Sequence, residues 1–197
     1  MQHLLLGVLW IVFCALHSLL ASGWLKRKLQ QRMGASYRYF RLYYTLFAFT
    51  TFIAILSYQV SIPSPFLFDR NIVFLMAGGA VLLVGCIIML LCIKKYFASL
   101  SGLKTLLSET ADKNVLLITG IHRYVRHPLY MGTFLFIWGL FLVMPYLSLL
   151  IADCIITGYT LIGIKWEEEK LVKEFGNAYK RYQQTVPKLI PFLRKGA

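Results

Sequence analysis

The residues best suited to chemistry gather in one short stretch, TGIHRYVRHPLYMG, which runs from Thr119 to Gly132. It combines two histidines, two arginines, two tyrosines and a proline. Pro128 is expected at the start of a helix, where the first backbone N–H groups have no acceptor within the helix. This mixture of cationic, aromatic and N–H groups suits a polar, partly aromatic ligand. The same composition also fits a basic anchor at a membrane surface, so both interpretations stay open.

A second candidate cluster is the acidic run Glu167-Glu168-Glu169. Three acids beside an apolar stretch are typical of a solvated helix start, where the helix dipole favours negative charge. Alternatively, one carboxylate turns back toward the first cluster and shares a pocket with it. Neither cluster has the HxxxH or HxxE spacing of a zinc site, so we expect no metal.

The elements that must position these clusters are long and apolar, and they predict an all-α integral membrane protein. Of 197 residues, 58% are hydrophobic and only 15% are charged, whereas about a quarter of a soluble domain is charged. A span needs about 20 apolar residues, and fewer inside a bundle. We predict five transmembrane helices, at residues 3–23, 39–60, 71–93, 129–143 and 147–165. Only residues 144–146 separate the last two, which predicts a helical hairpin.

Basic residues are distributed unevenly between the predicted loops. Every Lys and Arg except Arg70 lies in residues 24–41, 94–127 or 165–197, and the net charge is +13. With five spans, all three segments lie on one side of the membrane, which the positive-inside rule identifies as the cytoplasm. The N-terminus is then outside. Apolar spans with basic flanks indicate the lipid bilayer as the partner, rather than nucleic acid.

Room for a cytoplasmic site remains only in residues 94–128 and 165–191. In the second segment, helical spacing predicts a C-terminal amphipathic helix with Leu171, Phe175, Ala178 and Tyr182 on one face. The four cysteines lie in or beside apolar runs without a CxxC pair, so we expect buried thiols rather than disulfides or metal ligands. No repeat is found, and we expect one domain over residues 1–197.

Four motifs resemble one family of membrane enzymes. They are RHPLYMG (126–132), EEEKL (167–171), FGNAY (175–179) and VPKLIP (186–191), and they occur in the order and spacing of the isoprenylcysteine carboxyl methyltransferase superfamily. The resemblance covers roughly 40% of the chain, from about Asn114 to Pro191. The segment LHSLLAS (16–22) is similar to the members that include nurim and the bacterial methanethiol S-methyltransferases.

The resemblance implies an S-adenosylmethionine-dependent methyltransferase. Carried over position by position, it implies cofactor contacts from these residues: Asn114, Leu117, His122, His127, Pro128, Leu129, Tyr130 and Glu167. Family members often have His at position 114 and Tyr at position 122, where this chain has Asn and His. A carboxylate such as Glu167 suits the methionyl ammonium or a ribose hydroxyl of the cofactor. The chain has no glycine-rich Rossmann motif.

The acceptor that the resemblance implies is a small or lipophilic thiol, reached from the membrane or the cytoplasm. Eukaryotic carboxyl methyltransferases have a substrate-holding Arg four residues before the acidic pair, and this chain has Gly163 there. An isoprenylcysteine carboxylate is the second alternative and a phospholipid amine the third. A non-catalytic, nurim-like membrane protein is the alternative from another class.

Two histidines are candidates for accepting the acceptor's proton, because imidazole titrates near neutral pH. His122 lies in the first cluster, and His17 lies near the cytoplasmic end of the first predicted span. An ionisable residue within a span is a functional candidate by default, although a hydrogen bond between helices explains His17 equally well.

Overall fold

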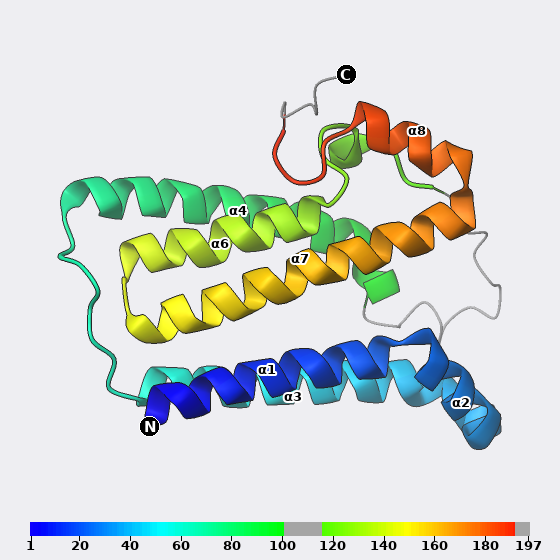
Figure 1. Ribbon diagram of the computed structural model, residues 1–197, viewed down its shortest axis with the longest axis horizontal. Helices are drawn as coiled ribbons and strands as arrows, with labels where there is room; N and C mark the ends of the chain where they lie inside the picture. Colours follow the sequence, from blue (N-terminus) through cyan, green and yellow to red (C-terminus); the bar gives the residue numbers. More distant parts are fainter. Residues whose placement is uncertain (101–115, 192–197) are drawn as a thin grey trace. The chain divides into compact units, whose positions relative to one another are not determined.

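The computed structural model describes residues 1–100 and 116–191, and these residues fold into helices without a strand (Figure 1). An isolated β-bridge joins Phe66 to Tyr146. The predicted all-helical class is therefore confirmed for the described residues. The elements are α1 (Gln2–Ala21), α2 (Gly23–Met33), the 3-10 helix η1 (Gly34–Tyr39), α3 (Phe40–Ser61), α4 (Ile72–Leu100), the 3-10 helix η2 (Gly120–Arg123), α6 (Pro128–Val143), α7 (Leu147–Phe175) and α8 (Asn177–Thr185).

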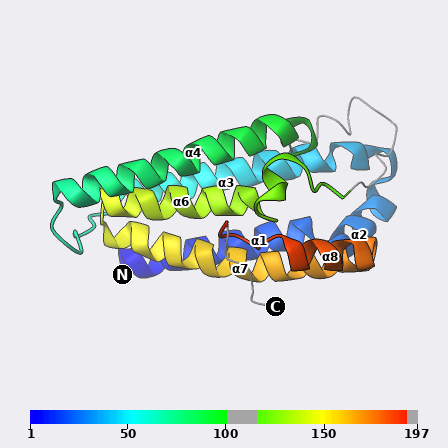
Figure 2. The same cartoon turned by 90° about the horizontal axis from the view of Figure 1, so that it is seen from above.

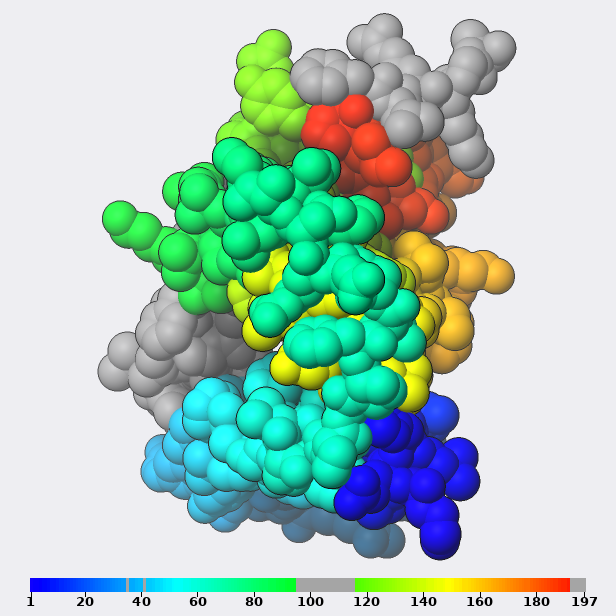
Figure 3. All heavy atoms as spheres, turned by 90° about the vertical axis from the view of Figure 1, so that its left-hand side faces the viewer, coloured from blue at the N-terminus to red at the C-terminus, as the bar shows by residue number. Residues whose placement is uncertain are grey.

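Four of the described helices are long and apolar enough to cross a membrane: α1, α3, α4 and α7. The helix α6 is apolar but has only 16 residues, or about 24 Å against a hydrocarbon core of about 30 Å. Many large apolar side chains are exposed, among them Ile72, Val73 and Met76 on the first turns of α4. Figure 3 shows this end of α4 on the surface of the protein. Such a surface is unfavourable in water, so these helices fit an integral membrane protein.

The described chain divides into two compact units. The first contains residues 1–68, 96–100 and 146–156, and the second contains residues 69–95, 116–145 and 157–191. The long helix α7 runs without a break through residues of both units.

In the first unit, α1 and α3 pack around an apolar core formed by Leu6, Trp10, Ile55, Ile62 and Ala152. Trp10 packs edge-on against the ring of Phe52 of α3, with ring centroids 5.8 Å apart. Its indole N–H donates a 2.9 Å hydrogen bond to the buried Gln59 side chain. The tryptophan therefore buries its ring without leaving the donor unsatisfied.

In the second unit, glycines let α4 and α6 approach closely. A Cβ atom added at Gly85 of α4 would lie 2.5 Å from the backbone N of Phe136, and one at Gly139 of α6 would lie 2.6 Å from the backbone N of Leu82. Small residues allow this backbone contact between apolar helices, where packing drives association. The second half of α7 joins this pair, because the Trp138 indole donates to the Thr157 hydroxyl at 3.1 Å (Figure 2).

Two features depart from the sequence-based expectations. Residues 24–41 are helical rather than a plain loop, because Ser22 ends α1 in an extended conformation and caps α2 by accepting the Leu25 N–H at 3.3 Å. The predicted single amphipathic helix through Leu171 and Tyr182 is wrong. The helix α7 continues to Phe175, Gly176 breaks it with a φ of +54°, and α8 follows. Glycine adopts this φ without the steric cost of a Cβ.

Candidate functional site

The turn before α6 is held by the segment that follows α8. The backbone N–H groups of Arg126 and His127 donate to the carbonyls of Pro187 (2.9 Å) and Lys188 (3.1 Å). The Arg126 guanidinium also donates to the carbonyls of Gln183 (3.0 Å) and Val186. The RHPLYMG and VPKLIP motifs, far apart in sequence, therefore form one hydrogen-bonded unit at the start of α6.

Glu168 of α7 pairs with the cations of this turn. The Arg126 guanidinium contacts the Glu168 carboxylate at 2.8 Å, and the His127 Nε2 lies 3.1 Å from the same oxygen, Oε1. Gln183 Nε2 donates to Oε2 at 3.3 Å, and Lys188 Nζ lies 3.6 Å away from it. Both oxygens of this buried carboxylate therefore have partners.

Glu168 lies in the charged end of α7, beyond the predicted span at 147–165, and its surroundings lower the pKa of its carboxyl group. Burial by itself raises the pKa of the Glu168 carboxyl. Hydrogen bonds from His127 and Arg126, and the positive charges of Arg126 and Lys188, outweigh the burial and hold this pKa at about 2. Glu168 is therefore an anion at neutral pH, and its neighbours already balance its charge.

Glu167 has different surroundings, although it is the next residue. Its side chain is 45% exposed, the Tyr130 side chain forms a hydrogen bond with it, and one of its oxygens lies 3.8 Å from His127 Nδ1. The rings of His127 and Tyr130 stack on one another with centroids 5.8 Å apart. Glu167 thus keeps access to solvent and to a ligand beside two aromatic rings.

Two tyrosines of α8 line the inner side of the cluster. Tyr182 donates from its hydroxyl to the carbonyl of His122 at 2.5 Å, and its ring packs edge-on against Tyr179. Tyr179 is 1% exposed, and its hydroxyl has no hydrogen-bond partner among the described residues. Burial, followed by the charge of Glu168, raises the Tyr179 pKa, so the hydroxyl stays a neutral donor. An unpaired buried hydroxyl is unfavourable unless something binds it.

The His122 ring has a fixed orientation in this arrangement. Its Nδ1 lies 3.1 Å from the carbonyl oxygen of Arg126. Because a carbonyl only accepts hydrogen bonds, Nδ1 carries the proton in this contact. A hollow of about 400 Å³ also adjoins the cluster, lined by Lys165, Glu168, Glu169, Val172, Lys173 and Gln183.

The predicted site residues fall into three groups. The second unit brings together His122, His127, Pro128, Leu129, Tyr130 and Glu167. Leu117 belongs to the same unit and is exposed, whereas Asn114 lies outside the described residues. His17 lies in the first unit, where Tyr44 forms a 2.9 Å hydrogen bond with its ring. Within the residues described, no group of three His, Cys, Asp or Glu side chains could hold a metal ion.

The sequence interpretation missed the buried partners Arg126, Glu168 and Tyr179. The acids are not a solvated helix start, because α7 runs through them without a break. A four-residue spacing could have identified Glu168, since Thr160, Ile164 and Glu168 share one face of α7 and all three are buried. The FGNAY motif ends at Tyr179, but helical spacing placed Ala178 rather than Tyr179 on the predicted apolar face.

Fold and site together define an all-helical membrane protein with a cation–carboxylate cluster between the start of one apolar helix and the end of another. The chain belongs to the family described as "Protein of unknown function (DUF1295)", whose model matches residues 2–186. No solved structure matches the chain significantly.

Curated relatives carry enzyme names. The chain is 43% identical over 76 residues to a methanethiol S-methyltransferase of Crocosphaera subtropica, covering 38% of this chain and 28% of the relative. It is 33% identical over 113 residues to a protein-S-isoprenylcysteine O-methyltransferase of Schizosaccharomyces pombe, covering 52% and 47%. A methanethiol S-methyltransferase of Pseudomonas deceptionensis is 38% identical over 77 residues, covering 38% and 28%. These names confirm the predicted resemblance, although the chain spans only about a quarter to a half of each relative's length.

Proposed function

We propose that this protein is an integral-membrane methyltransferase that uses S-adenosylmethionine to methylate a small or lipophilic thiol. The observation that carries the proposal is the convergence of the RHPLYMG turn with Glu167 of α7, since these segments lie about forty residues apart in the chain. The names of the curated relatives support the same activity.

The residues present fit the cofactor. Glu167 keeps an accessible carboxylate for an ammonium or a ribose hydroxyl. Leu129 and Tyr130 lie in the first turn of α6, where N–H groups lack helical acceptors and suit a carboxylate. The Tyr179 hydroxyl is buried, neutral and without a described partner. When bound, S-adenosylmethionine supplies an electrophilic methyl group on a sulfonium, so no metal is required.

The chain's own residues then orient ligands and handle one proton. Arg126 and Glu168 fix the turn, while Tyr130 and His127 hold Glu167. A thiol enters neutral and loses its proton as it attacks. His122 and His17 are the candidate bases for that proton. We therefore expect activity to rise with pH as the base becomes deprotonated.

We propose a five-span topology for the chain, with α6 and α7 as a helical hairpin inside one domain. The N-terminus lies outside, and the cofactor site lies on the cytoplasmic side. The distribution of Lys and Arg supports this orientation.

Gly163 supports the choice of a thiol acceptor. Without a cation at this position, a carboxylate acceptor would be buried without a charged partner, which is costly. Lys165 does not replace it, because two residues along a helix turn a side chain by about 200°. The S. pombe relative favours an isoprenylcysteine carboxylate as the second candidate.

One assay tests the proposal. Purified protein with radiolabelled S-adenosylmethionine is offered thiols of increasing chain length, farnesylcysteine and phospholipids. We expect transfer to thiols. Ester formation on farnesylcysteine with no thiol turnover would overturn the ranking, and the absence of cofactor binding by calorimetry would support a non-catalytic protein.

A matched pair of variants sharpens the choice of acceptor. A Cβ atom at Gly163 meets nothing within 4 Å, so a side chain fits there without displacing the backbone. We expect Gly163→Arg to raise farnesylcysteine turnover relative to thiol turnover, whereas Gly163→Ala keeps the wild-type preference. Equal preferences in both variants would exclude a role for position 163 in acceptor choice.

A further inference from the structure

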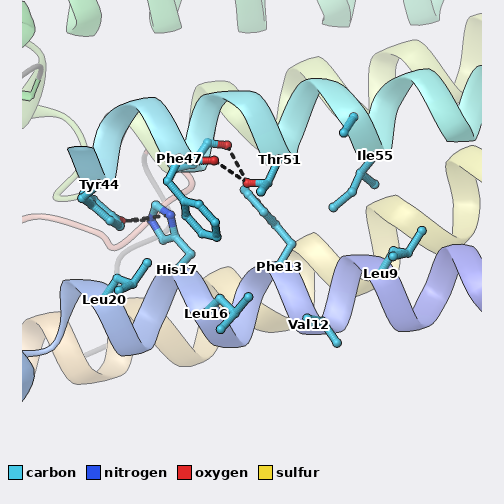
Figure 4. A pocket seen from close by; sticks show the side chains of 12 residues that line it. Leu9, Val12, Phe13, Leu16, His17, Leu20, Tyr44, Phe47, Thr51 and Ile55 are labelled. Atoms are coloured by element: carbon cyan, nitrogen blue, oxygen red, sulfur yellow. Dashed lines mark hydrogen bonds between the residues drawn. The ribbon is translucent and has the colours of Figure 1, made fainter. Parts of the chain in front are cut away.

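An elongated apolar pocket lies between α1 and α3 in the first unit (Figure 4). It encloses about 240 Å³ and is lined mainly by aliphatic and phenylalanine side chains from both helices. Thr51 turns its hydroxyl to the Phe47 carbonyl of its own helix at 2.7 Å. Water needs two to four polar partners, which these walls do not offer. A hydrocarbon chain is therefore the occupant that suits the pocket.

The pocket has one polar end and the length of one lipid leaflet. The ring of His17 and the hydroxyl of Tyr44 are hydrogen-bonded at that end (Figure 4). Along α1 the pocket extends from Leu9 to Leu20, or about 17 Å, while half of a bilayer's hydrocarbon core is about 15 Å. His17 lies four residues before the end of α1, so the polar end is near headgroup depth.

A basic surface adjoins this polar end of the pocket. The helix α2 and the 3-10 helix η1 follow α1 directly, and their exposed cations are Lys26, Arg27, Lys28, Arg32 and Arg38. Residues 1–68 contain no Asp or Glu. Trp24 is 59% exposed beneath the ammonium of Lys28, which lies 5.1 Å from the ring centroid. Exposed Trp with clustered cations is typical of a helix at the lipid headgroup level.

We propose that the first unit binds one anionic phospholipid. One acyl chain lies in the α1–α3 pocket, the ester region meets the His17–Tyr44 pair, and the phosphate headgroup lies on the basic surface of α2 and η1. Charge complementarity selects an anionic headgroup over a zwitterionic one, because residues 1–68 contain six Lys and Arg and no Asp or Glu. The proposal is independent of methyl transfer and needs no cofactor.

The test measures lipid retention by the full chain. The protein is purified in detergent, supplied with equal phosphatidylglycerol and phosphatidylcholine, and examined by native mass spectrometry for bound lipid. One variant neutralises the cations (Lys26→Gln, Arg27→Gln and Lys28→Gln together). Ala48→Phe fills the pocket, and Ala54→Phe does so from another position of its lining, in case the first variant does not fold.

Matched controls make the same changes elsewhere. Ala80→Phe adds a ring to an exposed position of α4, and Lys170→Gln with Lys180→Gln and Arg181→Gln removes three exposed cations from α7 and α8. We expect the wild type and both controls to retain phosphatidylglycerol at least tenfold over phosphatidylcholine.

Each outcome decides the proposal. The triple variant should lose the preference between headgroups, and the pocket-filling variants should retain at least tenfold less of both lipids. Equal retention of the two lipids by the wild type would overturn the anionic headgroup, as would an unchanged preference in the triple variant. Wild-type retention in both Ala48→Phe and Ala54→Phe would overturn the pocket as the chain site.

Discussion

Glu167 and Glu168 are adjacent in the chain, but their side chains differ in burial and in hydrogen-bond partners. Glu168 is buried and paired with Arg126 and His127, whereas Glu167 keeps 45% of its side chain exposed beside Tyr130. A carboxylate whose oxygens are occupied holds the fold, and an accessible one is available to a ligand. In the proposed function, Glu168 therefore stabilises the fold and Glu167 binds the cofactor.

The first prediction concerns this pair. Glu167→Gln should weaken S-adenosylmethionine binding about 10- to 100-fold by calorimetry, since a charge-assisted hydrogen bond contributes about 1.5–3 kcal/mol, and leave thermal stability unchanged. Glu168→Gln should lower thermal stability, because breaking a buried ion pair costs about 3–5 kcal/mol. Glu174→Gln, an exposed acid of the same helix, is the control. If Glu169→Gln weakens binding instead of Glu167→Gln, the ligand lies in the hollow next to Glu169.

The second prediction follows from the depressed pKa of Glu168. The folded protein holds this pKa at about 2, below the ordinary value of 4.5 for a Glu carboxyl. Between these pH values the unfolded chain takes up a proton that the folded chain does not. The stabilisation is therefore complete above pH 4.5 and is lost as the pH falls toward 2. Thermal unfolding of wild type and Glu168→Gln across this range should give curves that converge at low pH. A constant difference between them would contradict the assigned pairing.

At the residue scale, sequence motifs located the cluster but did not predict which carboxylate is buried and which stays accessible. The family resemblance implied a ligand contact from Glu167, whereas the rotation of α7 turns the Glu168 carboxylate inward to Arg126. The Arg126–Glu168 pair depends on a contact between residues 42 positions apart. No local pattern in the sequence encodes that contact.

At the element scale, the packing of α4 on α6 depends on glycines at matching seven-residue spacings. Gly78 and Gly85 of α4 lie against Gly132 and Gly139 of α6, with hypothetical Cβ contacts of about 3 Å or less. The sequence predicted both apolar helices, but a uniformly apolar helix does not indicate which face meets its neighbour.

The third prediction tests this packing. Gly85→Ala should destabilise the fold by about 1–3 kcal/mol or more, because the new methyl group would lie 2.5 Å from the Phe136 backbone and force the helices apart. Gly79→Ala, whose Cβ meets nothing within 4 Å, should be neutral or stabilising by up to about 1 kcal/mol. Thermal unfolding in one detergent compares the two. Equal loss of stability in both variants would mean that helix propensity, rather than contact, controls the effect.

Element boundaries were predictable where polarity changes along the chain. Apolar runs gave the starts of α3, α4 and α7 within a residue or two, since charged and proline residues bound them. The continuation of α7 to Phe175 was not predictable in this way, because its last turns are polar and their contacts with the turn at Arg126 hold them in place.

At the scale of the whole molecule, charge distribution predicts the topology. The fourth prediction is an external N-terminus and a cytoplasmic C-terminus, because every Lys and Arg except Arg70 lies in three segments on one side of a five-span chain. Cysteine labelling of intact cells should modify a cysteine introduced at position 2, while one introduced at position 184 should react only after permeabilisation. Protection of both positions in intact cells would require an even number of spans.

The hydrogen bonds from Arg126 and His127 to Pro187 and Lys188 also constrain the order of events during biosynthesis. Residues 187 and 188 follow every apolar helix that the structure describes, so the ribosome makes them after these helices. The turn at Arg126 is therefore translated some sixty residues before the Pro187 and Lys188 carbonyls that accept its hydrogen bonds. The described apolar helices are therefore all translated before the turn at Arg126 can acquire these hydrogen bonds.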